Sequence, residues 1–156
     1  MIALIQRVTM ARVQIAGCTG GEIGAGLLAL IGVERNDGTA QALRLLERLL
    51  DYRIFADAAG RMNRSLRDTA GGLLLVPQFT LVADTSTGNR PGFSTAAEPA
   101  RARDLYTQLL TAARAAHAPV AAGEFGAHME VTLTNDGPVT FWLAVPPAAS
   151  SPIIVA

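Results

Sequence analysis

The sequence predicts an α+β fold, a single domain with a mainly antiparallel, barrel-like sheet and two main helices. Strand-like segments occur near both ends of the chain, and two segments between them repeat apolar residues at helical spacing. Strands and helices do not alternate regularly, which argues against a sheet of βαβ units. The 156 residues suit one domain with its own core, and the single cysteine, Cys18, excludes an intrachain disulfide.

The first third of the chain predicts two strands and a helix. Residues 2–15 are aliphatic and β-branched and alternate apolar with polar side chains near the end, as a half-buried strand does. A glycine-rich turn at 17–21 leads to the apolar run 27–33, which is typical of a strand buried on both faces. We expect these two strands to form a hairpin. After the N-cap candidates at 36–39, a helix is expected from the apolar residues that recur at helical spacing: Ala42, Leu45, Leu46, Leu49 and Leu50.

The middle of the chain predicts one strand and one exposed loop. Polar residues dominate 57–68 and separate the first helix from the apolar run 73–76, which is expected to be a strand. The segment 83–93 contains two glycines and a proline and is therefore expected to form an exposed loop.

The last third predicts a second helix and two final strands. Pro99 suits the first helical turn, where its fixed φ and missing N–H cost nothing. The apolar stripe of this helix is formed by Ala102, Leu105, Leu109, Ala112 and Ala116. Apolar residues alternate with polar ones in 129–133 and 139–145, which predicts two strands. The domain is expected to span 1–145, followed by a frayed Pro/Ala/Ser-rich tail over 146–156.

The charge of the chain limits how it could bind nucleic acid. Thirteen basic residues, all arginine, balance thirteen acidic residues, so the net charge is zero. This balance argues against a protein that coats nucleic acid through many phosphates, but it allows one that grips a few nucleotides at one end. No signal peptide precedes the first apolar run, and no apolar segment reaches the ~18 residues of a membrane span, so we expect a cytoplasmic protein.

Familiar catalytic motifs are absent from the sequence. There is no Gly-x-Ser-x-Gly elbow, Walker loop or His-Glu-x-x-His helix, and no ligand spacing predicts a metal or another cofactor. His117 and His128 could each act as a general base, but neither accompanies a nucleophile and an orienting acid in a recognisable motif, so a structural role is favoured for both. An enzyme with this sequence would have to rely on geometry and main-chain dipoles.

Two short motifs carry the chemical information. Residues 77–81 (Pro-Gln-Phe-Thr-Leu) follow the buried strand, and residues 135–141 (Asn-Asp-Gly-Pro-Val-Thr-Phe) lie between the last two strands. Alone, the first is a strand end and the second a hairpin turn. Together they resemble the two signatures of the D-aminoacyl-tRNA deacylase (D-tyrosyl-tRNA deacylase) family, and the resemblance covers residues 1–145. Further matching segments lie at residues 1–8, 21–24, 52–55, 62–63 and 90–94.

The resemblance implies a hydrolase that cleaves the ester bond of D-aminoacyl-tRNA, and of mischarged glycyl-tRNA, to free amino acid and tRNA. An aminoacyl ester is already activated, so the expected catalytic residues Gln78, Phe79 and Thr80 need only position water and stabilise the oxyanion. The main-chain N–H groups of Phe79 and Thr80 are the expected donors. The Thr80 hydroxyl is the less favoured nucleophile because no base accompanies it, and the resemblance implies assistance by the terminal ribose hydroxyl instead.

The resemblance also implies how chirality is selected. In the family the Gly-Pro peptide, here Gly137-Pro138, is cis, and its carbonyl oxygens enter the active site of the partner subunit, where they receive the α-amino group and exclude an L-side chain. A homodimer follows from this arrangement. Arg7 is the expected brace of the turn, because a guanidinium donates in a fixed fork, although an exposed strand arginine is the alternative. The 3′-terminal adenosine of the aminoacyl-tRNA should lie against main chain and apolar side chains such as Phe79.

Pro77 departs from the family pattern, which usually has serine at this position. Proline removes a hydroxyl and a backbone donor, so any role of that hydroxyl in substrate binding is lost or taken by another group. We still expect Pro77 to belong to the substrate pocket, together with Gly137, Pro138 and Arg7.

Two other functions remain open at this point. A paralogue with a trans Gly-Pro bond would accept small L-aminoacyl-tRNA such as the alanyl form, although the context of residues 135–140 favours the D-specific type. A non-catalytic binder of the tRNA 3′ end is the second alternative, with Pro77 as a sign of decay. Arg61, Arg64 and Arg67 form either a basic cluster for phosphates or a solvated face.

Overall fold

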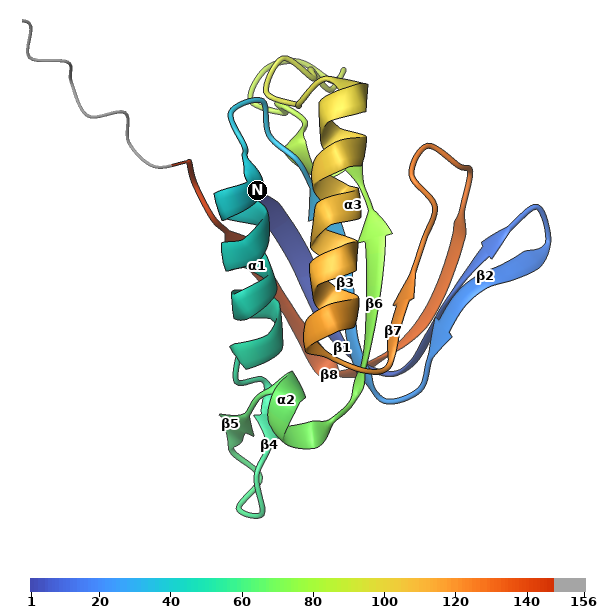
Figure 1. The fold of residues 1–156 in the computed structure, drawn as a ribbon, viewed down its shortest axis with the longest axis vertical. Helices are drawn as coiled ribbons and strands as arrows, with labels where there is room; N and C mark the ends of the chain where they lie inside the picture. The colour runs from blue at the N-terminus through green and yellow to red at the C-terminus, as the bar shows by residue number, and fades with distance from the viewer. Residues whose placement is uncertain (148–156) are drawn as a thin grey trace, which may run out of the picture.

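A bent sheet that carries two long helices on one face dominates the structure (Figure 1). The structure is a computed structural model that describes residues 1–147. Its elements in chain order are β1 (Ile2–Ile15), β2 (Cys18–Ile23), β3 (Gly26–Gly32), α1 (Thr39–Asp51), β4 (Phe55–Ala56), β5 (Met62–Arg64), α2 (Leu66–Thr69), β6 (Gly72–Pro77), the 3-10 helix η1 (Phe79–Val82), α3 (Pro99–Ala116), β7 (Val120–Ala122) and β8 (Glu130–Ala144). The predicted α+β class with two main helices is confirmed, and β1, β3 and β6 occupy the predicted strands 2–15, 27–33 and 73–76.

Strand β1 is the centre of the sheet. It pairs antiparallel with β8 along nearly its whole length, and its other edge pairs first with β3 and then with β2, as the predicted hairpin requires. The strand order is β2-β1-β3-β6-β7, in which β3-β6 and β6-β7 are parallel because the connections contain α1 and α3. The expected antiparallel pairs therefore share one sheet with two parallel pairs.

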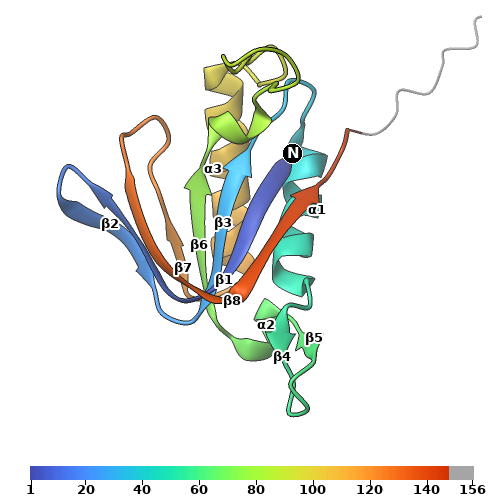
Figure 2. The ribbon, with the colours of Figure 1, turned by 180° about the vertical axis from the view of Figure 1, so that it is seen from behind.

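The sheet curls until its edge strands nearly meet. A Cβ atom on Gly21 in β2 would lie 2.8 Å from the carbonyl oxygen of Ala122 in β7, so only glycine permits this approach of two backbones. The predicted barrel-like core is confirmed in this sense. From behind, β8 lies beside β1 at the edge of the sheet, next to α1 (Figure 2).

The hydrophobic core has two parts. The larger one lies between the sheet and the two long helices, and it contains every residue of the stripe predicted for α1. The smaller one lies inside the curl of the sheet and consists of Val8, Ala11, Val13, Ile23, Leu28, Leu74 and Val76. In α3 the predicted stripe is buried as far as Leu109, but Ala113 rather than Ala116 completes it, since the last turn of the helix is exposed.

Local signals decide where the long helices begin. Gly38 is the N-cap of α1, within the predicted segment, and its N–H donates to Oε1 of Gln41 at 3.0 Å. Pro99 is the first residue of α3, as predicted.

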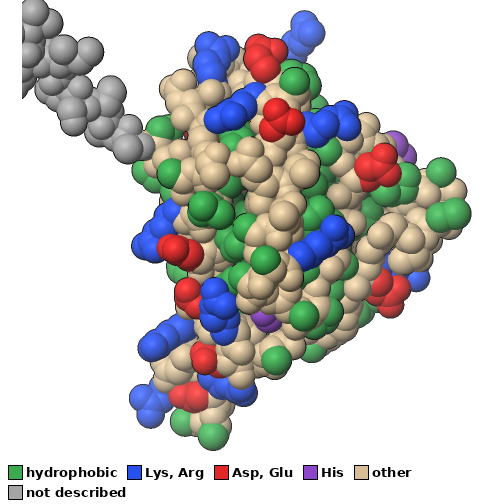
Figure 3. Space-filling model, in the orientation of Figure 1, with side chains coloured by type: hydrophobic (Ala, Val, Ile, Leu, Met, Phe, Trp, Pro, Cys, Tyr) green, Lys and Arg blue, Asp and Glu red, His purple; other side chains and the backbone are tan. Residues whose placement is uncertain are grey.

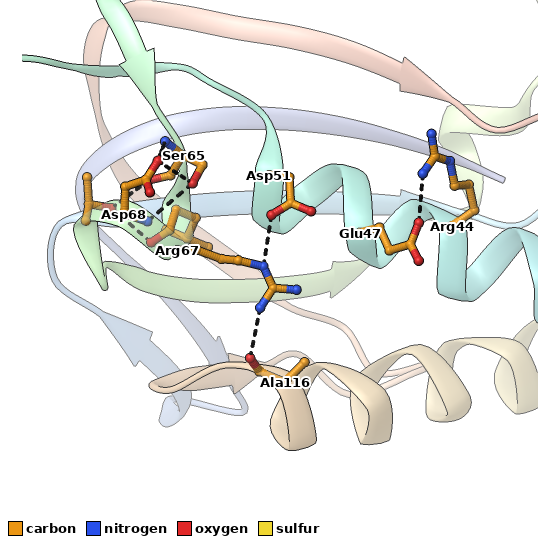
Figure 4. A network of polar contacts seen from close by, with 9 residues as sticks. Arg44, Glu47, Asp51, Ser65, Arg67, Asp68 and Ala116 are labelled. Carbon is orange, nitrogen blue, oxygen red and sulfur yellow. Dashed lines mark hydrogen bonds and ion pairs between the residues drawn. The ribbon is translucent and has the colours of Figure 1, made fainter.

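The short helix α2, which the sequence did not predict, fastens the two long helices together (Figure 4). Arg67 in α2 donates to Oδ1 of Asp51 at 2.9 Å, where α1 ends, and to the carbonyl oxygen of Ala116 at 3.3 Å, where α3 ends. The polar segment 57–68 therefore contains ordered elements: β5, which pairs with β4 just before the segment, and most of α2. They escaped prediction because hydrogen bonds rather than a periodic apolar stripe define them.

The C-terminal part of the fold differs most from the prediction. The prediction of two strands separated by a hairpin turn at 135–141 is wrong, because β8 is one strand that runs along β1 throughout. Between the pairs Gln6↔Thr140 and Val8↔Asn135, β1 advances by two residues (6 to 8) and β8 by five (140 to 135), so residues 136–139 bulge out of the ladder. Glycine and proline here mark a bulge rather than a chain reversal.

The predicted turn at 17–21 is too long. Ala16 and Gly17, both at positive φ, make the turn, and β2 already begins at Cys18. Strands β2 and β7 were not predicted, since β2 contains two adjacent glycines and β7 has only three residues.

The 83–93 loop is exposed at nearly every position, as predicted. In the described part of the chain, no helix is long and apolar enough to cross a membrane. Most of the predicted tail, residues 148–156, lies outside the described residues.

Tyr106 in α3 ties the helix to the strand that leads to the predicted catalytic residues. Its buried hydroxyl donates to the carbonyl oxygens of Leu75 and Gly123, each at 3.0 Å, and burial raises the pKa of Tyr106 above the ordinary value for a phenol. We expect Tyr106→Phe to lower the free energy of unfolding by about 1–2 kcal/mol, measured by urea denaturation at one protein concentration. Tyr52→Phe is the matched control, because Tyr52 contacts its neighbours through its ring. Equal losses in the two variants would contradict this role.

Candidate active site

The end of β6 leaves two neighbouring amides without protein partners. The N–H of Gln78 donates to the carbonyl oxygen of Ile31 at 2.8 Å, which is the last bond to β3, and η1 begins at the next residue. Within residues 1–147, the N–H groups of Phe79 and Thr80 meet no acceptor. The first amides of any helical turn lack an intrahelical acceptor, so these two are free for a ligand.

Pro77 is accommodated because the carbonyl oxygen that its missing N–H would face has another donor. Backbone groups alternate sides along a strand, and Gln78 faces β3, so the nitrogen of Pro77 faces the β7 side. On that side the last bond is from Gly123 N–H to the carbonyl oxygen of Leu75, and β7 has already ended at Ala122. The next acceptor in the parallel register is the carbonyl oxygen of Gly123, and it accepts from the hydroxyl of Tyr106 at 3.0 Å, so proline leaves no backbone acceptor unsatisfied here.

Thr80 carries a hydroxyl but no base. The side-chain amide of Gln78 donates to this hydroxyl, and no carboxylate or imidazole of the described residues forms a hydrogen bond with it. Both Thr80 and Phe79 are exposed, and 60% of the surface of Phe79 is accessible. The arrangement can present amide donors to a ligand, but it does not activate the hydroxyl as a nucleophile.

Two hollows of about 250 Å³ each lie on either side of Pro77 and Phe79. We call the first the apolar hollow; it is lined by Pro77, Phe79, Ala96, Ala97, Pro99, Ala102, Phe125 and Gly126. We call the second the mixed hollow; it is lined by Val76, Pro77, Gln78, Phe79, Gly126, Ala127, His128, Met129 and Val131. Phe79 also packs against Phe93 of the exposed loop, with ring centroids 5.1 Å apart and a tilt of 46°. The free amides therefore lie between an aromatic-lined hollow and a more polar one.

A larger groove of about 460 Å³ lies elsewhere, beyond the other end of η1. Leu81, Trp142 and Glu34 are among its lining residues, but none of residues 77–80 is. The largest of these cavities therefore lies away from the predicted catalytic residues. The free amides indicate the position of the candidate active site better than cavity volume does.

The Gly137-Pro138 turn is closely held by its own neighbours. The peptide bond between these two residues is cis. The side chain of Asn135 spans the bulge, accepting from the N–H of Val139 at 2.8 Å and donating to its carbonyl oxygen at 3.1 Å. A Cβ atom on Gly137 would lie 2.3 Å from the nitrogen of Val139, so this conformation requires glycine. Both Gly137 and Pro138 are exposed.

Arg7 contacts this turn, as a brace would. Its Nε donates to the carbonyl oxygen of Asp136 at 3.0 Å and lies 3.0 Å from the Oδ2 of the same residue. Its Nη1 donates to the carbonyl oxygen of Ile54 at 2.6 Å, which ties the turn to the segment before β4. The Arg7 side chain is 15% exposed, so the alternative of an exposed strand arginine does not describe it.

Within one chain, the turn and the free amides lie at opposite ends of β3. Arg7, which holds the turn, pairs with Leu27, whereas Pro77 pairs with Ile31. These two positions on β3 are four residues apart (27 to 31), or roughly 13 Å at 3.3 Å per residue. In Figure 1, β6 ends near the top of the sheet while β8 bends near the bottom. The fold thus brings residues 77–80 together and Arg7 together with 137–138, but keeps the two groups apart.

The other predicted polar residues have separate positions. Nε2 of His117 lies 2.7 Å from the carbonyl oxygen of Gly71, in agreement with a structural role. His128 is exposed and lines the mixed hollow beside Gln78, which the sequence did not indicate. On the face of the molecule drawn in Figure 3, basic and acidic side chains intermingle instead of forming one basic patch.

The basic cluster predicted from three arginines does not present three free cations. Arg67 is bound to Asp51, and Nη2 of Arg64 donates to the carbonyl oxygen of Asp68 at 2.5 Å. Both belong to the α2 region, away from the free amides.

Several residues of the site carry no motif in the sequence. Phe93, Ala102, Phe125 and Met129 come from a loop, from α3 and from the segment before β8, and they meet only in the folded chain. The sole signal was the Arg-Pro-Gly-Phe-Ser segment at 90–94, which contains Phe93.

Comparisons with known sequences agree on one family. The profile described as D-Tyr-tRNA(Tyr) deacylase matches residues 4–144. A D-aminoacyl-tRNA deacylase of Thioalkalivibrio sulfidiphilus is 64% identical over 147 residues, which cover 94% of this chain and 99% of the relative. A D-aminoacyl-tRNA deacylase of Cupriavidus metallidurans is 62% identical over 156 residues, covering 97% of this chain and all of the relative.

Solved structures show the same fold. A structure titled as the c-Myc DNA unwinding element binding protein superposes with a TM-score of 0.89 at 35% identity, covering 94% of this chain and all of that one. A probable eukaryotic D-amino acid tRNA deacylase superposes with a TM-score of 0.80 over 91% of this chain and 97% of its own, and its 16% identity supports the fold alone.

Proposed function

The chain belongs to the D-Tyr-tRNA(Tyr) deacylase family, and we propose that it performs hydrolysis with two main-chain amides in place of acidic or basic side chains. It is a hydrolase that acts on the ester bond of D-aminoacyl-tRNA. The observation that carries the proposal is the pair of N–H groups without protein acceptors within residues 1–147, at the exposed residues Phe79 and Thr80. Two fixed donors side by side suit the oxyanion that forms when water attacks an ester carbonyl.

The attacking water needs little help from the protein. The ester of an aminoacyl-tRNA is activated, and a free ribose hydroxyl of the terminal adenosine lies beside it in the substrate. This hydroxyl assists the water, while the Thr80 hydroxyl, which accepts from Gln78, helps to fix the loop. Gln78 and Thr80 thereby hold the two amides in place.

Thr80→Ala separates this mechanism from nucleophilic catalysis by threonine. Because the amide of residue 80 remains, we expect kcat to fall by less than about tenfold, well short of the ~10²–10⁴-fold loss seen when a general acid or base is removed. Single-turnover hydrolysis of D-tyrosyl-tRNA measures the change, and circular dichroism verifies the fold. Near-complete loss of turnover in a folded Thr80→Ala protein would show that the hydroxyl itself attacks.

The apolar hollow suits the terminal adenine of the substrate. Its lining is almost free of polar groups, and Phe79 and Phe125 offer ring surfaces of the kind that bind unstacked bases. With the base in this hollow and the ester at the free amides, the aminoacyl group enters the mixed hollow. Such an end-on footprint agrees with a chain of zero net charge.

Chirality is selected by the Gly137-Pro138 turn of a partner subunit in a homodimer. The turn is exposed, rigidly held by Asn135 and Arg7, and too far from the amides of its own chain to act there. Inserted into the mixed hollow of the partner, its carbonyl oxygens would accept from the α-amino group and occupy the space of an L-side chain. Glycine has no side chain to exclude, so glycyl-tRNA is a substrate as well.

Arg7→Ala tests the selection step. Loss of the brace frees the turn and weakens the steric barrier against an L-side chain. We therefore expect the ratio of D-tyrosyl-tRNA to L-tyrosyl-tRNA hydrolysis to fall at least about tenfold, which corresponds to about 1.4 kcal/mol of discrimination. The control is Arg48→Ala, because Nη1 of Arg48 also donates to a β8 carbonyl, that of Ala144 at 2.7 Å, but far from the turn. The proposal fails if the wild-type protein hydrolyses both isomers at comparable rates.

The same assay separates the alternatives. Hydrolysis of L-alanyl-tRNA with poor activity on D-tyrosyl-tRNA would identify the paralogue type, and no hydrolysis at all would identify a non-catalytic 3′-end binder. We expect activity on D-tyrosyl-tRNA and glycyl-tRNA and none on L-alanyl-tRNA.

A further inference from the structure

An exposed arginine, Arg103, stands at the rim of the apolar hollow. Its guanidinium carbon lies 5.2 Å from the ring centroid of Phe125, within the range of a cation–π contact. Its Nη2 lies 3.6 Å from the position that a Cβ of Gly126 would take. Phe125 and Gly126 both line the hollow, so the guanidinium is held at its edge.

The charge of Arg103 is not neutralised by a contact within residues 1–147. The acidic groups that form ion pairs there have other partners, as Asp51 does with Arg67 and Asp136 with Arg7. The neighbouring Arg101 differs, because it donates to the carbonyl oxygen of Asp37. Arg103 contacts the face of a ring instead, which orients its planar group and leaves the N–H donors at its edges available.

A planar fork of N–H donors beside a base-binding hollow is suited to a phosphate group. We propose that Arg103 binds the phosphodiester that links the terminal adenosine of the aminoacyl-tRNA to the preceding nucleotide. The inference rests on the proposed placement of the terminal adenine in the apolar hollow. This phosphate is the nearest anion to an adenosine whose base lies in the hollow and whose ester lies at the Phe79 and Thr80 amides.

The placement also explains how a neutral protein holds a polyanion. A single phosphate contact next to the reacting end adds affinity without a broad basic face, and the ring of Phe125 keeps the cation in position before the substrate arrives. An exposed contact of this kind is worth up to about fivefold in affinity.

Competition by two small probes tests the proposal on the intact protein. Adenosine and adenosine 5′-monophosphate differ only in the phosphate, and each is used to inhibit hydrolysis of D-tyrosyl-tRNA. In the wild-type protein we expect the monophosphate to inhibit about fivefold more tightly than adenosine. In Arg103→Ala we expect the inhibition constant of the monophosphate to rise until it equals that of adenosine. The inhibition constant of adenosine should not change.

The tRNA substrate supplies a second readout. In Arg103→Ala we expect KM for D-tyrosyl-tRNA to rise about fivefold with kcat unchanged, and the slope of log KM against log salt to flatten by about 0.7, the value for one contact to a single strand. Arg103→Lys should retain part of the effect, since it keeps the charge but loses the fork. Arg114→Ala, an exposed arginine on the same helix, is the control and should change neither quantity.

Several results would overturn the proposal. One is equal inhibition of the wild-type protein by adenosine and its monophosphate, and another is an equal loss of affinity for both probes in Arg103→Ala, which would mean that the side chain only shapes the hollow. A wild-type protein that fails to hydrolyse D-tyrosyl-tRNA would instead refute the proposed function, so the two failures are distinguishable.

Discussion

The proposed mechanism depends on how β6 ends. Gln78 makes the last backbone bond to β3, and the chain then turns into η1 so abruptly that the next two amides are left without acceptors. Unpaired amides are costly when buried, but Phe79 and Thr80 are exposed, and their cost is removed when a ligand oxygen binds. Tyr106 and the pairing with β3 hold the strand end from behind, so the donors are in place before the substrate arrives.

A second constraint follows from the length of β3. The turn at Gly137-Pro138 and the amides belong to opposite ends of this strand, and both are rigid in their own surroundings. One chain therefore keeps the turn and the amides apart, and in the proposed mechanism these are the two halves of the selective site. A two-fold dimer that apposes the two ends would create two identical sites at once, because each subunit would give and receive the same turn.

Those parts of the fold that have a periodic apolar pattern or a short motif could be predicted from the sequence. The buried stripe of α1, the start of α3 at Pro99 and strands β1, β3 and β6 follow from local patterns. The unbroken β8 could not be predicted, because Gly137-Pro138 has the composition of a hairpin turn, and only pairing with β1 over the whole length shows a bulge. The hollows could not be predicted for a related reason. Their lining residues, such as Ala102 and Phe125, are far apart in the chain and belong to no sequence motif. Pro77 looked like a defect in the sequence, but the Gly123 carbonyl oxygen that it faces accepts from the Tyr106 hydroxyl instead.

The central claim is that the N–H of residue 80, rather than its hydroxyl, stabilises the transition state. Replacing Thr80 by its α-hydroxy acid analogue removes that N–H and retains the side chain, and the same replacement at Thr85 in the exposed loop is the control. We predict a fall in kcat for D-tyrosyl-tRNA of about 10²–10³-fold at residue 80, with KM nearly unchanged and no effect at residue 85. An unaltered kcat after removal of the Thr80 amide would contradict the account.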